Sequence, residues 1–193
     1  MHTTEAFLAV ADATGNNTYR VRAGRIIDHV IEWAAHNRWR IPEHFKSDWS
    51  LDLECNADKK DDQFKPYGAT PGHGIEWARL IVQWALSSFA NRDGARPYID
   101  AAEHLFARAV DDAWNVDGAE GLVYTTDWNG TPVVTDRMHW TAAESLNTAA
   151  TLHAATGEAR YATGTPRSPA TSTSTSSTTK ADHGSTSLTA TIA

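Results

Sequence analysis

Residues 71–79 read PGHGIEWAR, and this stretch decides how the chain is interpreted. A Pro-Gly step comes first, His73 follows, and Glu76 and Trp77 come about one helical turn later. Proline is favoured in the first turn of a helix, so the stretch predicts a helix that begins beside an imidazole. Two interpretations are open. His73 is a tolerated helix-start residue with Glu76 as an ordinary capping partner, or the pair faces a pocket.

Composition limits the classes of protein that the chain could represent. Its 193 residues are 41% hydrophobic and carry a formal net charge of −7, which suits one domain with a core. An acidic chain lacks the positive field that attracts nucleic acids and anionic membranes, so neither partner is expected. No apolar run approaches the roughly 20 residues that span a bilayer. We see no signal peptide, and the single cysteine, Cys55, cannot form an internal disulfide, so a cytoplasmic location is expected.

Five segments carry apolar residues at the spacing of amphipathic helices. They are residues 5–15, 18–37, 73–91, 97–115 and 139–157, with Pro97 expected near the first turn of the fourth. The connectors between them have a β-like character. In particular, the Asn129-Gly130 pair lies between two short β-like runs and is a strong hairpin signal.

An internal similarity predicts the architecture. MHTTEAFLAVADATGNNTYR at 1–20 resembles MHWTAAESLNTAATLHAATGEARY at 138–161. Recurring helix pairs with hairpin excursions predict an all-α toroid of helical hairpins, and five long helices are too few to close the ring. Composition then changes abruptly, because the segment 162–193 is rich in Ser and Thr and has no aromatic residue. We therefore expect a partial helical barrel over 1–161 and a disordered tail over 162–193.

Three histidines each open a predicted helix and precede a carboxylate: His2 with Glu5, His73 with Glu76, and His139 with Glu144. In a toroid, the first turns of the inner helices can face one end of a cavity, where helix dipoles favour anions such as an enediolate. Imidazoles are suited to moving protons at neutral pH. Any single pair also fits a surface histidine beside a capping glutamate. HGIE is not HExxH and no Cys/His cluster has ligand spacing, so no metal site is expected.

Several motifs together resemble a known family. KPYGATPGHGIEWARLIVQW at 65–84 resembles the signature of the N-acylglucosamine 2-epimerase superfamily. Its PGHxxEWARL wording resembles the mannose isomerase and sulfoquinovose isomerase branch. MHTTEAFLAVADATGN resembles the family's NMHxxEA helix, RIPEHFKSDW its substrate-facing excursion, and RMHWTAAESLNTA its later tryptophan-bearing helix. The resemblance extends from Met1 to about Tyr161.

The resemblance implies an (α/α)6 six-hairpin barrel that binds a monosaccharide at one end. It implies an isomerase or epimerase that removes the C2 proton of an open-chain aldose through an enediol(ate), with histidines as acid and base and no cofactor or metal. By motif, His73 corresponds to a catalytic acid/base, and His2 to a histidine near the reacting carbons. The expected sugar-binding or histidine-orienting residues are Glu5, Gln63, Glu76, Trp77 and Trp140.

The chain also departs from the family pattern. Complete members are longer, and their second catalytic histidine lies near the C-terminus in a motif like KxDxYH, whereas KADHG at 180–184 resembles it by coincidence. We therefore expect a truncated chain whose tail is read in a shifted frame, and whose own activity is in doubt. Two alternatives stay open: a glycoside hydrolase that pairs Glu76 with Asp111 or Asp127, and a non-catalytic remnant. The sequence does not set the sugar or the oligomeric state.

Overall fold

The computed structural model describes residues 1–162, and the expected tail lies outside them apart from Ala162. The described part contains five long helices and one two-stranded sheet. In chain order the elements are α1 (His2–Thr14), α2 (Asn17–His36), α3 (Pro71–Ser88), α4 (Arg92–Ala113), β1 (Thr125–Thr126), β2 (Pro132–Val134), α5 (His139–Thr156) and the 3₁₀ turn η1 (Ala159–Tyr161).

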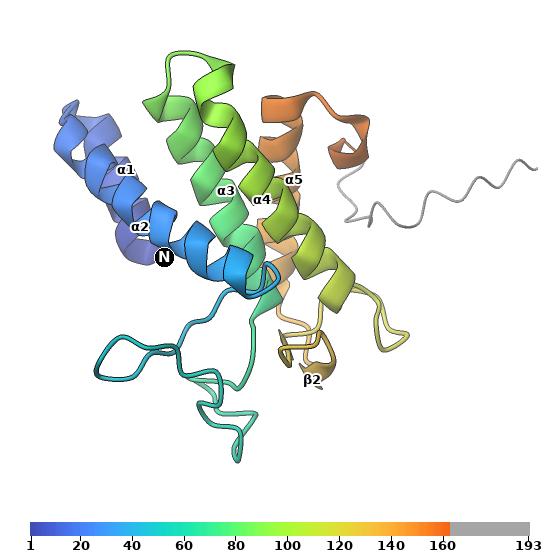
Figure 1. Cartoon of the computed structure of the whole chain (residues 1–193). Helices are drawn as coiled ribbons and strands as arrows, with labels where there is room; N and C mark the ends of the chain where they lie inside the picture. The colour runs from blue at the N-terminus through green and yellow to red at the C-terminus, as the bar shows by residue number, and fades with distance from the viewer. Residues whose placement is uncertain (163–193) are drawn as a thin grey trace, which may run out of the picture.

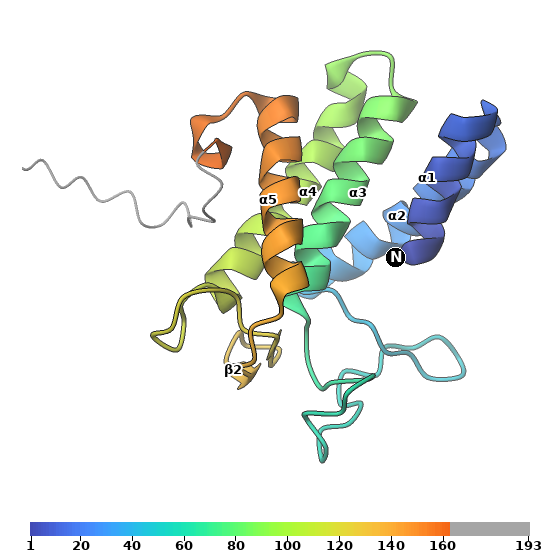
Figure 2. The same cartoon turned by 180° about the vertical axis from the view of Figure 1, so that it is seen from behind.

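The helices form two layers (Figures 1 and 2). Helices α1, α3 and α5 lie on one face, and α2 and α4 lie on the other. The chain alternates between the layers, so α1 pairs with α2 and α3 pairs with α4 as helical hairpins. Helix α3 lies between α1 and α5 and packs against α4 and α5. The first turns of α1, α3 and α5 all lie at the end that carries the connectors.

Local signals explain most of the helix ends. Asn16 caps α2, because its side chain accepts a hydrogen bond from the Thr18 backbone N–H at 3.0 Å. Helices α1 and α5 both begin at a histidine and end at glycines with positive φ, Gly15 and Gly157, as the internal similarity predicted. Left-handed glycines are common helix C-caps.

The predicted start of α4 is wrong by five residues. The helix begins at Arg92, and Pro97 lies inside it. The Asn91 side chain accepts a hydrogen bond from the Gly94 backbone N–H at 3.0 Å and caps the helix earlier. Proline removes one backbone hydrogen bond, but its fixed φ suits a helix. The cap therefore decided the boundary.

The core is centred on α3. Ile75, Leu80, Ile81 and Val82 are each 0–1% exposed, because α3 is covered by α4 on one side and by α5 on another. Trp84 joins this core to the first hairpin, since its indole Nε1–H donates to the backbone oxygen of Arg20 at 2.9 Å. Burial of such side chains contributes about 1.5–3 kcal/mol each to folding.

The predicted hairpin is present and docks on a buried ion pair. Strands β1 and β2 pair antiparallel around Asn129-Gly130. Arg40 donates to both carboxylate oxygens of Asp112, at 2.6 and 2.9 Å. A Cβ atom on Gly130 would lie 2.7 Å from this pair, and the φ of Gly130 is +90°. The turn therefore needs glycine because its φ is positive and because a side chain would collide with the ion pair. The ion pair also fixes the connector that follows α2.

Within residues 1–162, no helix combines the length and apolarity that crossing a membrane requires.

Candidate functional site

The Pro-Gly step places His73 against an aromatic wall. Pro71 is the first residue of α3, and a Cβ on Gly72 would lie 2.6 Å from the Trp140 ring. Glycine therefore lets the first turn of α5 lie close to the first turn of α3. As a result, the rings of His73 and Trp140 are 5.4 Å apart between centroids. The stretch 71–73 builds a contact between the first turns of α3 and α5.

A carboxylate from a distant connector holds the His73 ring. His73 Nδ1–H donates to Glu43 Oε1 at 2.7 Å, and the two side chains are 30% and 25% exposed. Arg40, three residues before Glu43, is anchored to Asp112, so the connector is fixed where Glu43 must act. Because Glu43 takes the Nδ1 proton in a hydrogen bond, Nε2 is the nitrogen left to exchange protons.

Two of the helix-opening histidines share one cavity of about 380 Å³, lined by His2, His73 and Glu43. The rest of its wall is mostly apolar and aromatic and includes Ile26, Trp33, Ile41, Pro42, Phe45 and Trp77. A few convergent polar groups in an otherwise apolar concavity are typical of small-molecule sites. The cavity therefore offers two imidazoles to one ligand.

Electrostatics raises the proton affinity of His73. Burial alone would lower its pKa, but the hydrogen bond and charge of Glu43, with the charge of Glu76, outweigh burial and raise the pKa above its ordinary value. Protonated His73 therefore stabilises the fold. This contribution is full below the unfolded pKa of about 6.5 and is lost as pH rises through the higher folded-state value.

Replacing Glu43 by glutamine is expected to lower the pKa of His73, because the carboxylate charge is removed while the shape of the side chain is kept. The free energy of unfolding should then fall less as pH rises through the folded-state pKa of His73. NMR titration of the imidazole and urea unfolding at several pH values measure both effects. Glu32→Gln is the matched control, since Glu32 lies 3.9 Å from His29 and both side chains are exposed. Equal titrations of His73 in wild type and Glu43→Gln contradict the assignment.

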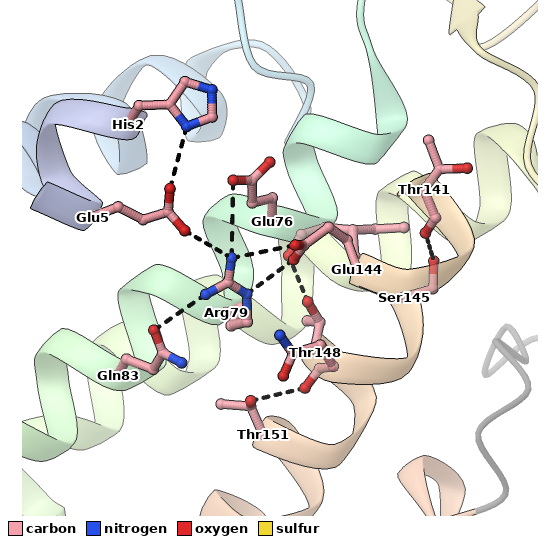
Figure 3. A network of polar contacts seen from close by, with 12 residues as sticks. His2, Glu5, Glu76, Arg79, Gln83, Thr141, Glu144, Ser145, Thr148 and Thr151 are labelled. Atoms are coloured by element: carbon pink, nitrogen blue, oxygen red, sulfur yellow. Dashed lines mark hydrogen bonds and ion pairs between the residues drawn. The ribbon is translucent and has the colours of Figure 1, made fainter. Parts of the chain in front are cut away.

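The carboxylates that follow the three helix-opening histidines meet at Arg79 (Figure 3). Arg79 Nε donates to Glu144 Oε2 at 2.9 Å, and Nη2 donates to Glu5 Oε1 at 3.2 Å. Nη1 donates to Gln83 at 3.4 Å, and Glu76 Oε1 lies 3.9 Å from Nη2. The guanidinium thereby joins α1, α3 and α5.

Glu76 is the carboxylate of this group that keeps free acceptor capacity. Its side chain is 8% exposed, and within residues 1–162 it accepts no hydrogen bond that meets ordinary geometry. Burial, and then the charges of Glu144 and Glu5, raise its pKa. Its carboxylate oxygens can therefore still accept a hydrogen bond from a ligand hydroxyl.

Comparison with known proteins identifies the family. A family model described as N-acylglucosamine 2-epimerase (GlcNAc 2-epimerase) matches residues 1–180. The chain belongs to this family. Curated relatives of the chain include D-mannose isomerases. It is 47% identical over 162 residues to one from Thermobifida fusca, and 45% identical over 163 residues to one from Pseudomonas cannabina pv. alisalensis. Each match covers 83% of this chain but 39% of the relative.

Solved structures agree with the family fold. A crystal structure of D-mannose isomerase has a TM-score of 0.76 and 30% identity, with 83% of this chain and 40% of that chain covered. A sugar epimerase from a ruminal bacterium, with a TM-score of 0.61, 17% identity and coverage of 83% and 37%, shows the fold alone. The predicted fold, part of an all-α toroid of helical hairpins, is confirmed.

The structure brings most of the predicted site residues of this family member together. His2, His73 and Trp77 line the cavity, while Trp140 contacts His73. Glu5 accepts from His2 at 3.2 Å and from Arg79. Trp77 is also 6% exposed and belongs to the core. Its role therefore includes packing.

One predicted residue lies elsewhere, and two contributing residues were missed. Gln63 is exposed on the long connector and does not line the cavity of His73. Glu43 was missed because it precedes its partner by 30 residues. Arg79 was missed because it lies in an apolar helical run, although a lone charge three residues after Glu76 was a usable signal.

The ligand atoms of His2, Glu5 and Glu76 lie within 4.8 Å of one another, a spacing that a metal ion could use. The Arg79 guanidinium lies 3.2 Å from a Glu5 oxygen and 3.9 Å from a Glu76 oxygen, so both carboxylates already have a cation beside them.

The two aspartates considered for a hydrolase make contacts of their own or face solvent. Asp111 is exposed on α4. Asp127 accepts from the backbone N–H groups of Asn129 and Thr131, both at 2.8 Å, and so shapes the hairpin turn. Among the described residues, neither aspartate contacts Glu76.

Proposed function

We propose that this chain supplies the His73 side of a monosaccharide isomerase or 2-epimerase site, with an aldose such as D-mannose as substrate. The observation that carries the proposal is His73, held by Glu43 at 2.7 Å and lining a cavity that His2 also lines. Family membership supports the reaction class. The relatives named D-mannose isomerase support the choice of sugar.

The chemistry follows from the placement of the imidazoles. His73 Nε2 takes the proton from C2 of the open-chain aldose, and the C–H electron pair forms the C1=C2 bond of an enediolate with negative charge on O1. Returning a proton to C1, with transfer of the O2 proton to O1, gives the ketose. Returning it to the opposite face of C2 gives the epimer. His2, on the wall of the same cavity, is the candidate for the hydroxyl proton transfers.

The surrounding groups favour that intermediate. The first turns of α1 and α3 carry partial positive charge on their backbone N–H groups and lie at the same end of the two helices. His73 is in the first turn of α3, so this charge can stabilise an oxyanion that develops beside it. The Glu76 carboxylate can accept from a sugar hydroxyl. Trp140 and Trp33 offer flat faces for the C–H side of the sugar.

The test is C2 exchange in deuterium oxide. The purified chain is incubated with D-mannose, and NMR follows deuterium at C2 of mannose and the formation of fructose or glucose. We expect deuterium at C2 together with the ketose or the 2-epimer. D-mannitol, which has no carbonyl and therefore no acidic C2 proton, is the matched control. Exchange at the buffer rate with mannose, glucose and fructose alike contradicts the proposal.

A further inference from the structure

We propose that Arg79 is a positioning residue that, by holding the carboxylates of three helices, keeps Glu76 charged and thereby sets the proton affinity of His73. The inference rests on the proposed function of His73 but concerns its protonation, which is measurable without turnover. The carrying observation is the convergence of Glu5, Glu76 and Glu144 on one buried guanidinium (Figure 3).

The guanidinium is nearly saturated by protein groups. Arg79 is 7% exposed, and it donates to Glu144, to Glu5 and to Gln83. Arginine presents donors in a fixed planar fork, so one side chain can serve carboxylates from several directions. An arginine so occupied is more suited to orienting protein groups than to binding substrate.

The charges do not balance, and this makes Arg79 important. Three carboxylates against one guanidinium leave a net charge of −2 on these four side chains, and the Met1 α-amino group is near enough for the charges of Glu76 and Glu5 to act on it. Glu144 and Glu5 raise the pKa of Glu76 after burial does, while His73 and Arg79 oppose that rise. Of the three carboxylates, Glu76 is the most buried, with side-chain exposure of 8% against 22% for Glu144 and 39% for Glu5. Without Arg79, the pKa of Glu76 is therefore expected to rise further.

The effect reaches His73 through Glu76. The groups that act on the imidazole are Glu43 from the connector, Glu76 from its own helix and the α-amino group of Met1 on α1; α5 contributes the uncharged ring of Trp140. Loss of the Glu76 charge removes one of the two carboxylates that favour the imidazolium. Arg79 therefore tunes an acid/base group that it does not contact.

The experiment is an NMR titration of the histidine rings in the full chain, with the His73 signal assigned from a His73→Gln spectrum. Arg79→Met is expected to shift the His73 midpoint downward, and Arg79→Lys, which keeps the charge, is expected to restore part of the shift. Glu144→Gln removes a repelling carboxylate, so it should not lower the midpoint. If Arg79→Met does not fold, Arg79→Lys and Glu144→Gln still test the proposal. The first is expected to lower the His73 midpoint by a smaller amount, and the second is expected not to lower it.

Arg20→Lys is the control for a purely structural role, because it loosens an arginine–carboxylate pair, Arg20–Asp12 at 2.8 Å, that includes no carboxylate beside Arg79 or His73. It should lower stability slightly and leave the His73 midpoint unchanged. The proposal is overturned if the Arg79 variants titrate like wild type, or if Arg20→Lys shifts the His73 midpoint as much as they do. Since no substrate is involved, a chain that titrates as expected but exchanges no deuterium refutes the proposed function alone.

Discussion

Replacing His73 by glutamine is expected to slow C2 deuterium exchange with D-mannose by about 10²- to 10⁴-fold, the usual contribution of a positioned acid/base group. Glutamine keeps a polar side chain beside Glu43 but cannot take up a proton from carbon. The pH dependence of the residual exchange rate should no longer show the titration of His73. Exchange rates measured by NMR across pH, with unfolding curves to confirm the fold, give the comparison.

His139→Gln is the control for this variant. His139 also opens an inner helix but is exposed, and it does not line the cavity of His73. Its exchange rate should stay close to that of wild type. If the exchange rate falls less than threefold in His73→Gln, or falls equally in both variants, the imidazole of His73 does not carry the proton.

Replacing Asp112 by alanine is expected to destabilise the fold by about 3–5 kcal/mol, because it leaves Arg40 buried without its partner. The two side chains are 7% and 5% exposed, and Arg108 also donates to Asp112 at 3.4 Å. The connector that carries Glu43 is anchored here, so the His73 titration should change as well. Urea unfolding and NMR measure the two effects.

Two further variants test whether the loss of stability comes from an unpaired buried charge. Asp100→Ala removes an ion pair in which both side chains are about half exposed, and it should cost far less because water replaces the partner. The double variant Arg40→Met/Asp112→Leu should recover most of the lost stability, since an apolar pair leaves no buried charge. Equal costs for Asp112→Ala and Asp100→Ala would contradict the role given to the buried pair.

Helices α2 and α4 were predictable because each buries a face whose apolar residues recur at helical spacing, whereas α5 also buries Thr141, Ser145 and Thr148. The hairpin was predictable from Asn129-Gly130, whose turn geometry is local. The predicted start of α4 was wrong because proline is common in the first turn of a helix, whereas Asn91 caps this helix so that it begins at Arg92, five residues before Pro97. A cap that satisfies a backbone donor decides where a helix begins, and an internal proline costs it one hydrogen bond.

The candidate site was predictable where it depends on motif and helix geometry. His2 and His73 share a cavity, and their following carboxylates converge, because parallel helices bring equivalent first turns together. Glu43 could not be predicted, since its position depends on how Arg40 anchors the connector to α4. Gln63 lies on the same long connector, and no periodic pattern sets where such a segment turns.

The ion pair beneath the hairpin also bears on the order of folding. Helix pairs such as α3 and α4 join residues close in the chain, whereas Arg40 and Asp112 are 72 positions apart. Closing a longer loop costs more chain entropy, and contacts between distant residues form more slowly. We therefore infer that the α3–α4 hairpin forms first and that the loop bearing Glu43 locks later, so that the proposed acid/base centre at His73 matures after the hairpin that carries it.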